Sequence, residues 1–276
     1  MRNKKYLFVL LSVIAILAVA VFPVSAITDG EPDGNGHPQV VLILMEVNGQ
    51  PAYRCSGTLI APTFVLTAGH CAGAPGEFSG IRIFTESDVD NGSNNYPYAG
   101  PNSIEALNWA AHPDYPYAPF YFNDVGMIEL AAPVNGVPYA TLPAVDSLDK
   151  LKTKRGQQDV TFTAVGYGLQ KSFPDAAAWK TVANRVRMVA HPKLNQINVP
   201  GFTGDFSLLL SNNAHTGGTC FGDSGGANFL GDSNVIAGIT SFGLNSTCGG
   251  TGGVFRTDRQ NVQDFVNGFM AAPYTP

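Results

Sequence analysis

The chain alternates short apolar runs with segments rich in glycine, proline and polar residues. The apolar runs are dominated by β-branched and aliphatic residues, which pack well on the pleated surface of a strand. Many short strands at this spacing are typical of a β-sandwich or of β-barrels. The runs that predict strands span residues 39–47, 56–66, 125–130, 160–165, 185–189 and 235–242.

One segment near the C-terminus follows a helical period instead. Its apolar residues recur at intervals of three and four, which places them on one face of a helix. Thr257 or Asp258 is available as the N-cap. We expect this helix to pack on the second half of the chain as a structural element. The residues that share the helical face are Val262, Phe265, Val266, Phe269 and Met270.

Two polar segments, residues 86–101 and 212–219, predict exposed loops. Asp88 and Asp90 in the first loop raise the question of a calcium site. Their spacing does not follow a known calcium-binding loop, so a solvated loop is the favoured interpretation.

Residues 1–26 have the three parts of a secretory signal peptide. A basic start with Arg2, Lys4 and Lys5 is followed by an apolar run over 7–22 and by small residues at 24–26. The apolar run is shorter than the about 20 residues of a membrane-spanning helix. An uncleaved membrane anchor is the alternative. We expect export, cleavage after Ala26 and no stable membrane association afterwards.

Composition and charge narrow the possible partners. With 45% hydrophobic and 13% charged residues, the chain of 276 residues is typical of a packed globule. Cleavage at residue 26 removes three basic residues and no acidic one, so the formal charge changes from −5 to −8. A nucleic-acid partner would call for a basic face, so we expect none.

The chain has four cysteines, which should be paired in an exported protein. Three connectivities are possible, and local pairing of Cys55 with Cys71 and of Cys220 with Cys248 is the simplest. Zinc binding is the alternative, but the sequence has no CxxC pair and its histidines are scattered. We therefore expect no metal and no other cofactor.

The candidate nucleophile is Ser224, within Gly-Asp-Ser-Gly-Gly at 222–226. A serine hydroxyl becomes reactive on a tight turn that exposes it to a base and to backbone N–H groups. The flanking glycines permit such a turn. A flexible surface loop would contain the same residue types, so the nucleophile also needs a base elsewhere in the chain.

His70 is the candidate base, because Thr-Ala-Gly-His-Cys at 67–71 places it among small residues where a predicted strand ends. Asp124 is the candidate acid that orients it. Asp124 opens the apolar run at 125–130, where a buried carboxylate requires a partner such as an imidazole N–H. Asp114 and Asp146 lie in loop-like sequence and are poorer candidates.

These three motifs, in the order His…Asp…Ser, resemble those of the chymotrypsin/trypsin-like serine proteases. The resemblance runs from Ile27 to the final helix and includes Cys-Ser-Gly-Thr-Leu-Ile at 55–60 and Val-Gly-Tyr-Gly at 165–168. It implies one peptidase domain over 27–276, built from two six-stranded antiparallel β-barrels around a catalytic cleft. The first barrel would span about 27–137, the second about 138–258, and a C-terminal α-helix about 259–271.

The resemblance also implies residue roles. Ser224 would attack the peptide carbonyl, His70 would serve as general base and then general acid, and Asp124 would hold the imidazole. The backbone N–H groups of Gly222 and Ser224 would form the oxyanion hole. A new N-terminus at Ile27 would pair with Asp223, and signal-peptide cleavage alone would create it.

The same resemblance places the primary specificity pocket. Gly218 would lie at its base, which excludes a trypsin-like demand for Lys or Arg. Gly243 and Gly253 would form small walls, and Ser241, Phe242 and Gly243 would pair with the substrate backbone. Such a pocket would be deep and uncharged, favouring large apolar or aromatic P1 residues.

We therefore expect a secreted, extracellular serine endopeptidase that acts on proteins or peptides as a monomer. A catalytically inactive binding module on the same fold is one alternative. A serine esterase is another, although an α/β-hydrolase would show the order Ser…Asp…His.

Overall fold

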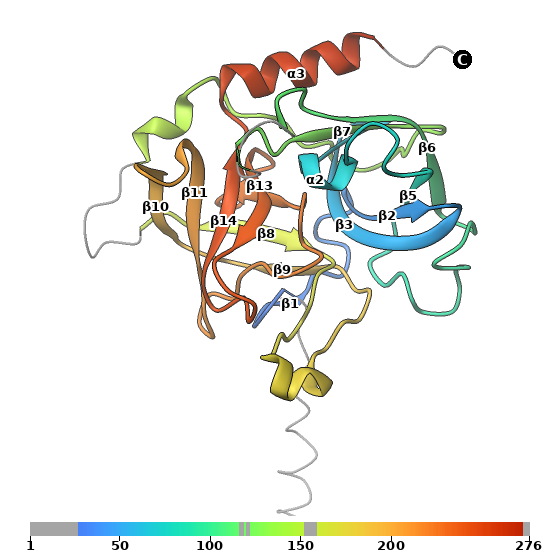
Figure 1. Cartoon of the computed structure of the whole chain (residues 1–276), viewed down its shortest axis with the longest axis horizontal. Coiled ribbons are helices and arrows are strands. Elements are labelled where there is room, and N and C mark those ends of the chain that lie inside the picture. The colour runs from blue at the N-terminus through green and yellow to red at the C-terminus, as the bar shows by residue number, and fades with distance from the viewer. Residues whose placement is uncertain (1–26, 116–118, 120–121, 152–158, 273–276) are drawn as a thin grey trace, which may run out of the picture.

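The computed structural model describes residues 27–115, 119, 122–151 and 159–272. The predicted signal peptide, residues 1–26, lies outside this range. Strands dominate the described chain and form two units that lie side by side, with a helix across one end of the molecule (Figure 1). The expected fold class, mostly β with a C-terminal helix, is confirmed.

The first unit is a closed antiparallel barrel in the order β2-β3-β4-β7-β6-β5. Aliphatic side chains on both faces of its strands are buried, such as those of Leu42 and Ile43 on β2 and Val65 and Leu66 on β4, which have no exposed surface. The expected strand over 56–66 is two strands, because the chain turns back between β3 and β4. The barrel strands are β2 (Val40–Val47), β3 (Gln50–Ala61), β4 (Phe64–Thr67), β5 (Gly80–Phe84), β6 (Ser103–Ala111) and β7 (Gly126–Leu130).

The second unit is an eight-stranded antiparallel sheet in the order β1-β9-β8-β12-β13-β14-β11-β10. It curls into a half-barrel of eight strands, where a six-stranded barrel was expected. Two short 3₁₀ helices accompany it, η2 (Ser147–Lys150) and η3 (Asp175–Lys180). The sheet strands are β1 (Glu31–Pro32), β8 (Phe162–Gly166), β9 (Met188–Ala190), β10 (Leu194–Val199), β11 (Gly204–Asn212), β12 (Ala227–Leu230), β13 (Ile236–Gly243) and β14 (Gly250–Arg256).

The N-terminal segment belongs to the second unit. β1 pairs with β9, with Glu31 opposite Val189. Before β1, Thr28 forms an antiparallel bridge with Gly218. The expected boundaries put residues 27–137 in the first barrel, but this first stretch packs on the second sheet before the chain enters β2.

The C-terminal helix α3 (Gln260–Ala271) matches the expected position, and its contacts extend beyond the second half of the chain. It crosses back to the first barrel, where Phe269 meets Phe64 of β4 with ring centroids 6.2 Å apart. The N-cap is Arg259, without a side-chain cap bond. Asp258 cannot serve as that cap because its carboxylate accepts the Leu148 N–H and pairs with Arg256.

Two disulfides link the four cysteines, Cys55 to Cys71 and Cys220 to Cys248. The loop at 86–101 is less solvated than its composition indicates. Val89 within it is fully buried and donates its N–H to the Arg185 carbonyl. None of the described helices is long and apolar enough to cross a membrane.

Candidate active site

His70 lies where a barrel strand turns into a short helix. β4 ends at Thr67, and His70 is the second residue of α2 (Gly69–Ala72). Cys71 is buried, whereas 31% of the His70 side chain is exposed. The disulfide to Cys55 ties this turn to β3. The local fold therefore holds the imidazole at the barrel edge with part of its surface open to solvent.

Asp124 lies just before β7 and is completely buried. Oδ1 accepts the backbone N–H of His70 at 3.0 Å, and Nδ1 of the imidazole lies 3.0 Å from Oδ2. The hydroxyl of Ser241, on β13 of the second sheet, donates to Oδ2 at 2.5 Å. A buried carboxylate needs such donors to offset its desolvation. The structure thus brings Asp124, His70 and Ser241 together from both units.

The turn that carries Asp124 is held from a distant part of the chain. Asn123 has a φ of +56°, a left-handed conformation that asparagine tolerates better than most residues. Its side-chain oxygen accepts a hydrogen bond from the Asn261 amide at 2.8 Å. Asn261 lies on α3, a helix that we expected to have no part in the site. A single amide contact across 138 residues has no sequence signal.

The electrostatics favour the protonated imidazole. Burial alone would lower the pKa of His70, but the charge of Asp124 and its hydrogen bond outweigh burial and raise the pKa above its ordinary value. An imidazole in this setting can take up a proton and be stabilised as the cation. This is the property that a general base needs during acyl transfer.

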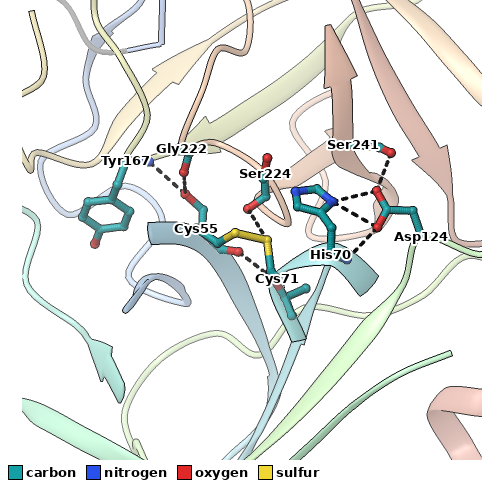
Figure 2. The surroundings of a disulfide bond; sticks show 10 residues. Cys55, His70, Cys71, Asp124, Tyr167, Gly222, Ser224 and Ser241 are labelled. Atoms are coloured by element: carbon teal, nitrogen blue, oxygen red, sulfur yellow. Dashed lines mark hydrogen bonds and ion pairs between the residues drawn. A yellow bond between two sulfur atoms is a disulfide. The ribbon is translucent and has the colours of Figure 1, made fainter. Parts of the chain in front are cut away.

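Ser224 lies on a tight loop of the second unit, and the His70 ring lies between it and the Asp124 carboxylate (Figure 2). Gly225 follows with a φ of +78°. A Cβ at Gly225 would lie 2.0 Å from Oγ1 of Thr67, so only glycine lets the loop approach β4 this closely. The glycine next to the candidate nucleophile is therefore required for contact between the two units.

The backbone around Ser224 presents two N–H groups. In the part of the chain that the structure describes, the N–H groups of Gly222 and Ser224 have no protein acceptor. Gly222 has a φ of +97°, another conformation that requires glycine. Unpaired N–H groups beside a nucleophile can bind a developing oxyanion. The geometry is thus compatible with the oxyanion role expected of both residues.

Asp223 is fully buried. Its carboxylate accepts the N–H groups of Gly168 and Cys220 at 2.7 and 2.8 Å. Burial raises its pKa to about 7, although these two hydrogen bonds act in the opposite direction. Ile27 is also fully buried, against Ala164 and its neighbours. Within the described part of the chain, the hydrogen bonds of the Asp223 carboxylate go to Gly168 and Cys220, and none joins it to Ile27.

A cavity of about 80 Å³ adjoins Ser224. Phe242 and Gly243 line it, together with Ser241. Gly253 does not, because the ring of Phe242 lies 2.3 Å from the position of a Gly253 Cβ and covers this residue.

Gly218, the expected pocket base, does not line the cavity either. Its Cβ position lies 2.4 Å from the side chain of Asn212, which fills that space. The Asn212 side chain accepts a hydrogen bond from the Thr28 hydroxyl and donates one to the Thr219 carbonyl. The deep pocket expected from small wall residues is therefore closed by two larger side chains, Phe242 and Asn212, whose positions a sequence motif does not show.

Comparison with known proteins identifies the family. The family model described as Trypsin matches residues 29–266. The chain belongs to the trypsin family. Among trypsin-family relatives, brachyurin of Leptuca pugilator is 29% identical over 71% of this chain and 78% of its own length. Phenoloxidase-activating factor 3 of Holotrichia diomphalia is 27% identical over 80% of this chain.

The chain spans only part of some relatives. It covers 65% of phenoloxidase-activating factor 3 and 16% of the serine protease Hayan of Drosophila melanogaster, with which it shares 32% identity over 38% of its own length. Solved structures show the same trypsin-family fold. A structure titled HL collagenase has a TM-score of 0.66 at 19% identity, covering 90% of this chain and all of its own. Human heparin binding protein has a TM-score of 0.63 at 18% identity, covering 90% of this chain and 99% of its own.

Proposed function

We propose that the protein is a secreted serine endopeptidase that acts through Ser224, His70 and Asp124. The observation that carries this proposal is the line formed by a buried carboxylate, an imidazole 3.0 Å from it and a serine on a glycine-bounded turn. Membership of the trypsin family supports hydrolysis as the reaction. The three side chains come from two units, so the site exists only in the folded chain.

In this mechanism His70 accepts the Ser224 hydroxyl proton while Oγ bonds to the peptide carbonyl carbon. The tetrahedral intermediate collapses as His70 gives the proton to the leaving amine, which leaves an acyl group on Ser224. Water then attacks the acyl carbonyl carbon while His70 accepts a proton from it. His70 returns the proton to the Ser224 oxygen as the acyl bond breaks, and the carboxylic acid product leaves. Asp124 holds the tautomer with hydrogen on Nδ1 and stabilises the imidazolium.

Covalent labelling tests this proposal directly. A fluorophosphonate probe should modify Ser224 and abolish hydrolysis of casein in proportion to labelling, with the site mapped by mass spectrometry. A serine esterase would also be labelled but would leave casein intact. An inactive binding module would show neither reaction while keeping its fold.

We further propose that cleavage after Ala26 creates the active N-terminus at Ile27. Ile27 has a φ of +51°, which is strained for a β-branched residue at a cost of about 1–3 kcal/mol. Hydrolysis of the preceding peptide bond removes this torsion, and the new ammonium is then free to pair with the buried Asp223. N-terminal sequencing of the exported protein should therefore begin at Ile27. A start at another residue would refute this model.

The pairing also predicts a pH dependence. In a chain whose Ile27 nitrogen is blocked, Asp223 has a pKa of about 7, above the ordinary value of 3.8, so the folded state binds a proton that the unfolded state releases. This contribution to stability is complete below about pH 4 and is lost as pH rises through 7. An ammonium at Ile27 lowers the pKa of Asp223, so the mature chain should lose less stability over this interval.

Denaturant unfolding between pH 4 and 8 measures this difference. The chain that starts at Ile27 should be compared with the same chain acetylated at its N-terminus, because acetylation removes the charge and changes little else. The acetylated chain should show the steeper loss of stability and the lower activity. Identical profiles for the two chains would exclude a pair between Ile27 and Asp223.

The small size of the cavity beside Ser224 supports a preference for small uncharged P1 residues over the large ones expected from the sequence. Its volume of about 80 Å³ is below the roughly 150 Å³ of a protein cavity that accepts benzene. Phe242→Ala should uncover Gly253 and increase kcat/KM for substrates with P1 Phe relative to P1 Ala. Trp179→Ala, which removes an aromatic side chain that is 81% exposed, is the control. Cleavage of a peptide library with varied P1 residues measures this preference. Equal P1 profiles for wild type and Phe242→Ala would contradict the role of Phe242 in limiting the size of the P1 residue.

A further inference from the structure

Ser56 on β3 reaches from the first barrel to the loop that carries the candidate nucleophile. Its hydroxyl donates a hydrogen bond to the Gly222 carbonyl at 3.0 Å and accepts one from the Tyr167 N–H at 3.0 Å. Ser56 has no exposed surface. The hydroxyl thus connects three separate segments of the chain.

The backbone of the same residue adds a second contact. The Ser56 N–H donates to the Ser224 carbonyl at 2.8 Å. Ser56 therefore binds the carbonyl groups on both sides of Asp223, one through its side chain and one through its backbone. The Ser56 carbonyl in turn accepts the Thr67 hydroxyl at 2.9 Å, which fixes Ser56 within the barrel.

These contacts restrict the peptide groups that face the substrate. The Gly222 carbonyl belongs to the peptide group between Gly222 and Asp223, and this group lies between the N–H groups of Gly222 and Ser224. Turning this peptide plane would break the bond from the Ser56 hydroxyl and would shift the N–H groups on both sides of it. The buried Ser56 hydroxyl would then lose the acceptor for its proton, which is costly for a buried group. Gly168, which follows Tyr167, donates its N–H to the Asp223 carboxylate. The segment just after β8 therefore also holds the loop that carries Ser224.

We propose that Ser56 is a positioning residue: it fixes the peptide group between Gly222 and Asp223 and so keeps the N–H groups on both sides, those of Gly222 and Ser224, in the orientation that binds the oxyanion. This inference rests on the proposed function of Ser224. The hydroxyl acts from the first barrel and needs no charge at Ile27. Because the oxyanion develops only in the transition state, we expect Ser56 to affect the chemical step more than substrate binding.

Ser56→Ala tests this role. kcat for a peptide p-nitroanilide should fall by about 10-fold or more, below the 10²–10³-fold caused by outright loss of an oxyanion donor. KM should change little, and affinity for a peptidyl trifluoromethyl ketone, whose hemiketal carries an oxyanion, should fall in parallel with kcat. The matched control is Thr163→Val, which removes a buried hydroxyl that donates to the Gly231 carbonyl at 2.8 Å.

Both variants should show similar decreases in melting temperature, and only Ser56→Ala should lose kcat. An unchanged kcat in Ser56→Ala, or an equal loss in Thr163→Val, would overturn the positioning role. Hydrogen exchange provides a readout that is independent of catalysis, since the Tyr167 amide should exchange faster in Ser56→Ala alone. If wild type neither cleaves casein nor reacts with a fluorophosphonate, the proposed function fails, while exchange still reports whether Ser56 holds the loop.

Discussion

Replacing Ser224 with alanine is expected to lower kcat for peptide hydrolysis by about 10⁶-fold, the loss that follows removal of a nucleophile whose base acts only through it. The reason lies in the geometry of the loop. Alanine keeps the backbone N–H at 224 and the bond from Ser56 N–H to the carbonyl of residue 224, so the oxyanion donors remain while the attacking oxygen is gone. KM should change little.

The measurement compares Ser224→Ala with wild type and with Ser233→Ala. Ser233 is an exposed serine whose hydroxyl donates to the Leu230 carbonyl at 2.7 Å, which makes it a matched loss of one hydroxyl outside the site. Casein hydrolysis and fluorophosphonate labelling should disappear in Ser224→Ala and persist in Ser233→Ala, with similar melting temperatures for all three proteins. Equal casein cleavage by Ser224→Ala and wild type would end the triad mechanism.

The sequence located the candidate triad because each member lies beside a local pattern with a physical cause. His70 follows the end of a strand, Asp124 opens an apolar run, and Ser224 has glycines that its turn requires. The apolar runs and the glycines therefore predict where strands end, and the candidate residues lie at those ends. The strand-rich fold follows from the same periodicity, because the β2, β7 and β13 patterns are strongly apolar.

Strands that are rich in glycine could not be predicted from the sequence. β14 begins Gly-Thr-Gly-Gly, which is typical of a loop, yet it pairs with β11 and β13 along most of its length. Its glycines are tolerated because neighbours occupy the space of the missing side chains, as the Phe242 ring does at Gly253. The closed pocket follows from this contact, and no local pattern indicates where that ring lies.

Single hydrogen bonds between residues far apart in the chain could not be predicted from the sequence either. Ser56 bonds to the carbonyl of Gly222 across 166 residues, and Asn261 bonds to Asn123 across 138. Neither residue belongs to a pattern with a fixed period, because each acts by one hydrogen bond rather than by burial. Supporting groups of this kind become visible only once the units are placed together.

The two buried aspartates of the candidate site, Asp124 and Asp223, differ in what they can stabilise. Asp124 receives the imidazole and the Ser241 hydroxyl, so its charge is opposed by a group that can itself become a cation. Asp223 receives only backbone N–H groups from Gly168 and Cys220, and its pKa is raised to about 7. Asp124 thus has a partner that can carry a positive charge, whereas Asp223 has only neutral hydrogen-bond donors among the described residues.

Asp124→Asn provides the sharpest test of how the imidazole is held. Asparagine has nearly the shape of aspartate, but its amide can donate to Nδ1 of His70 and so favour the tautomer with hydrogen on Nε2. That tautomer cannot accept the Ser224 proton, and kcat at neutral pH should fall by about 10⁴-fold. The pKa of His70 should also fall, because burial lowers it and the carboxylate that raises it is gone.

NMR titration of the His70 ring and the pH profile of kcat measure the two effects together. In wild type the raised pKa keeps the imidazole protonated to higher pH, so activity should rise with pH as His70 loses its proton. In Asp124→Asn this rise should begin at lower pH and reach a far lower plateau. Asp114→Asn is the control, since it removes a 75% exposed carboxylate 4.0 Å from His112 and should leave both measurements unchanged. An equal kcat and an equal His70 pKa in the two variants would show that Asp124 neither orients nor charges the base.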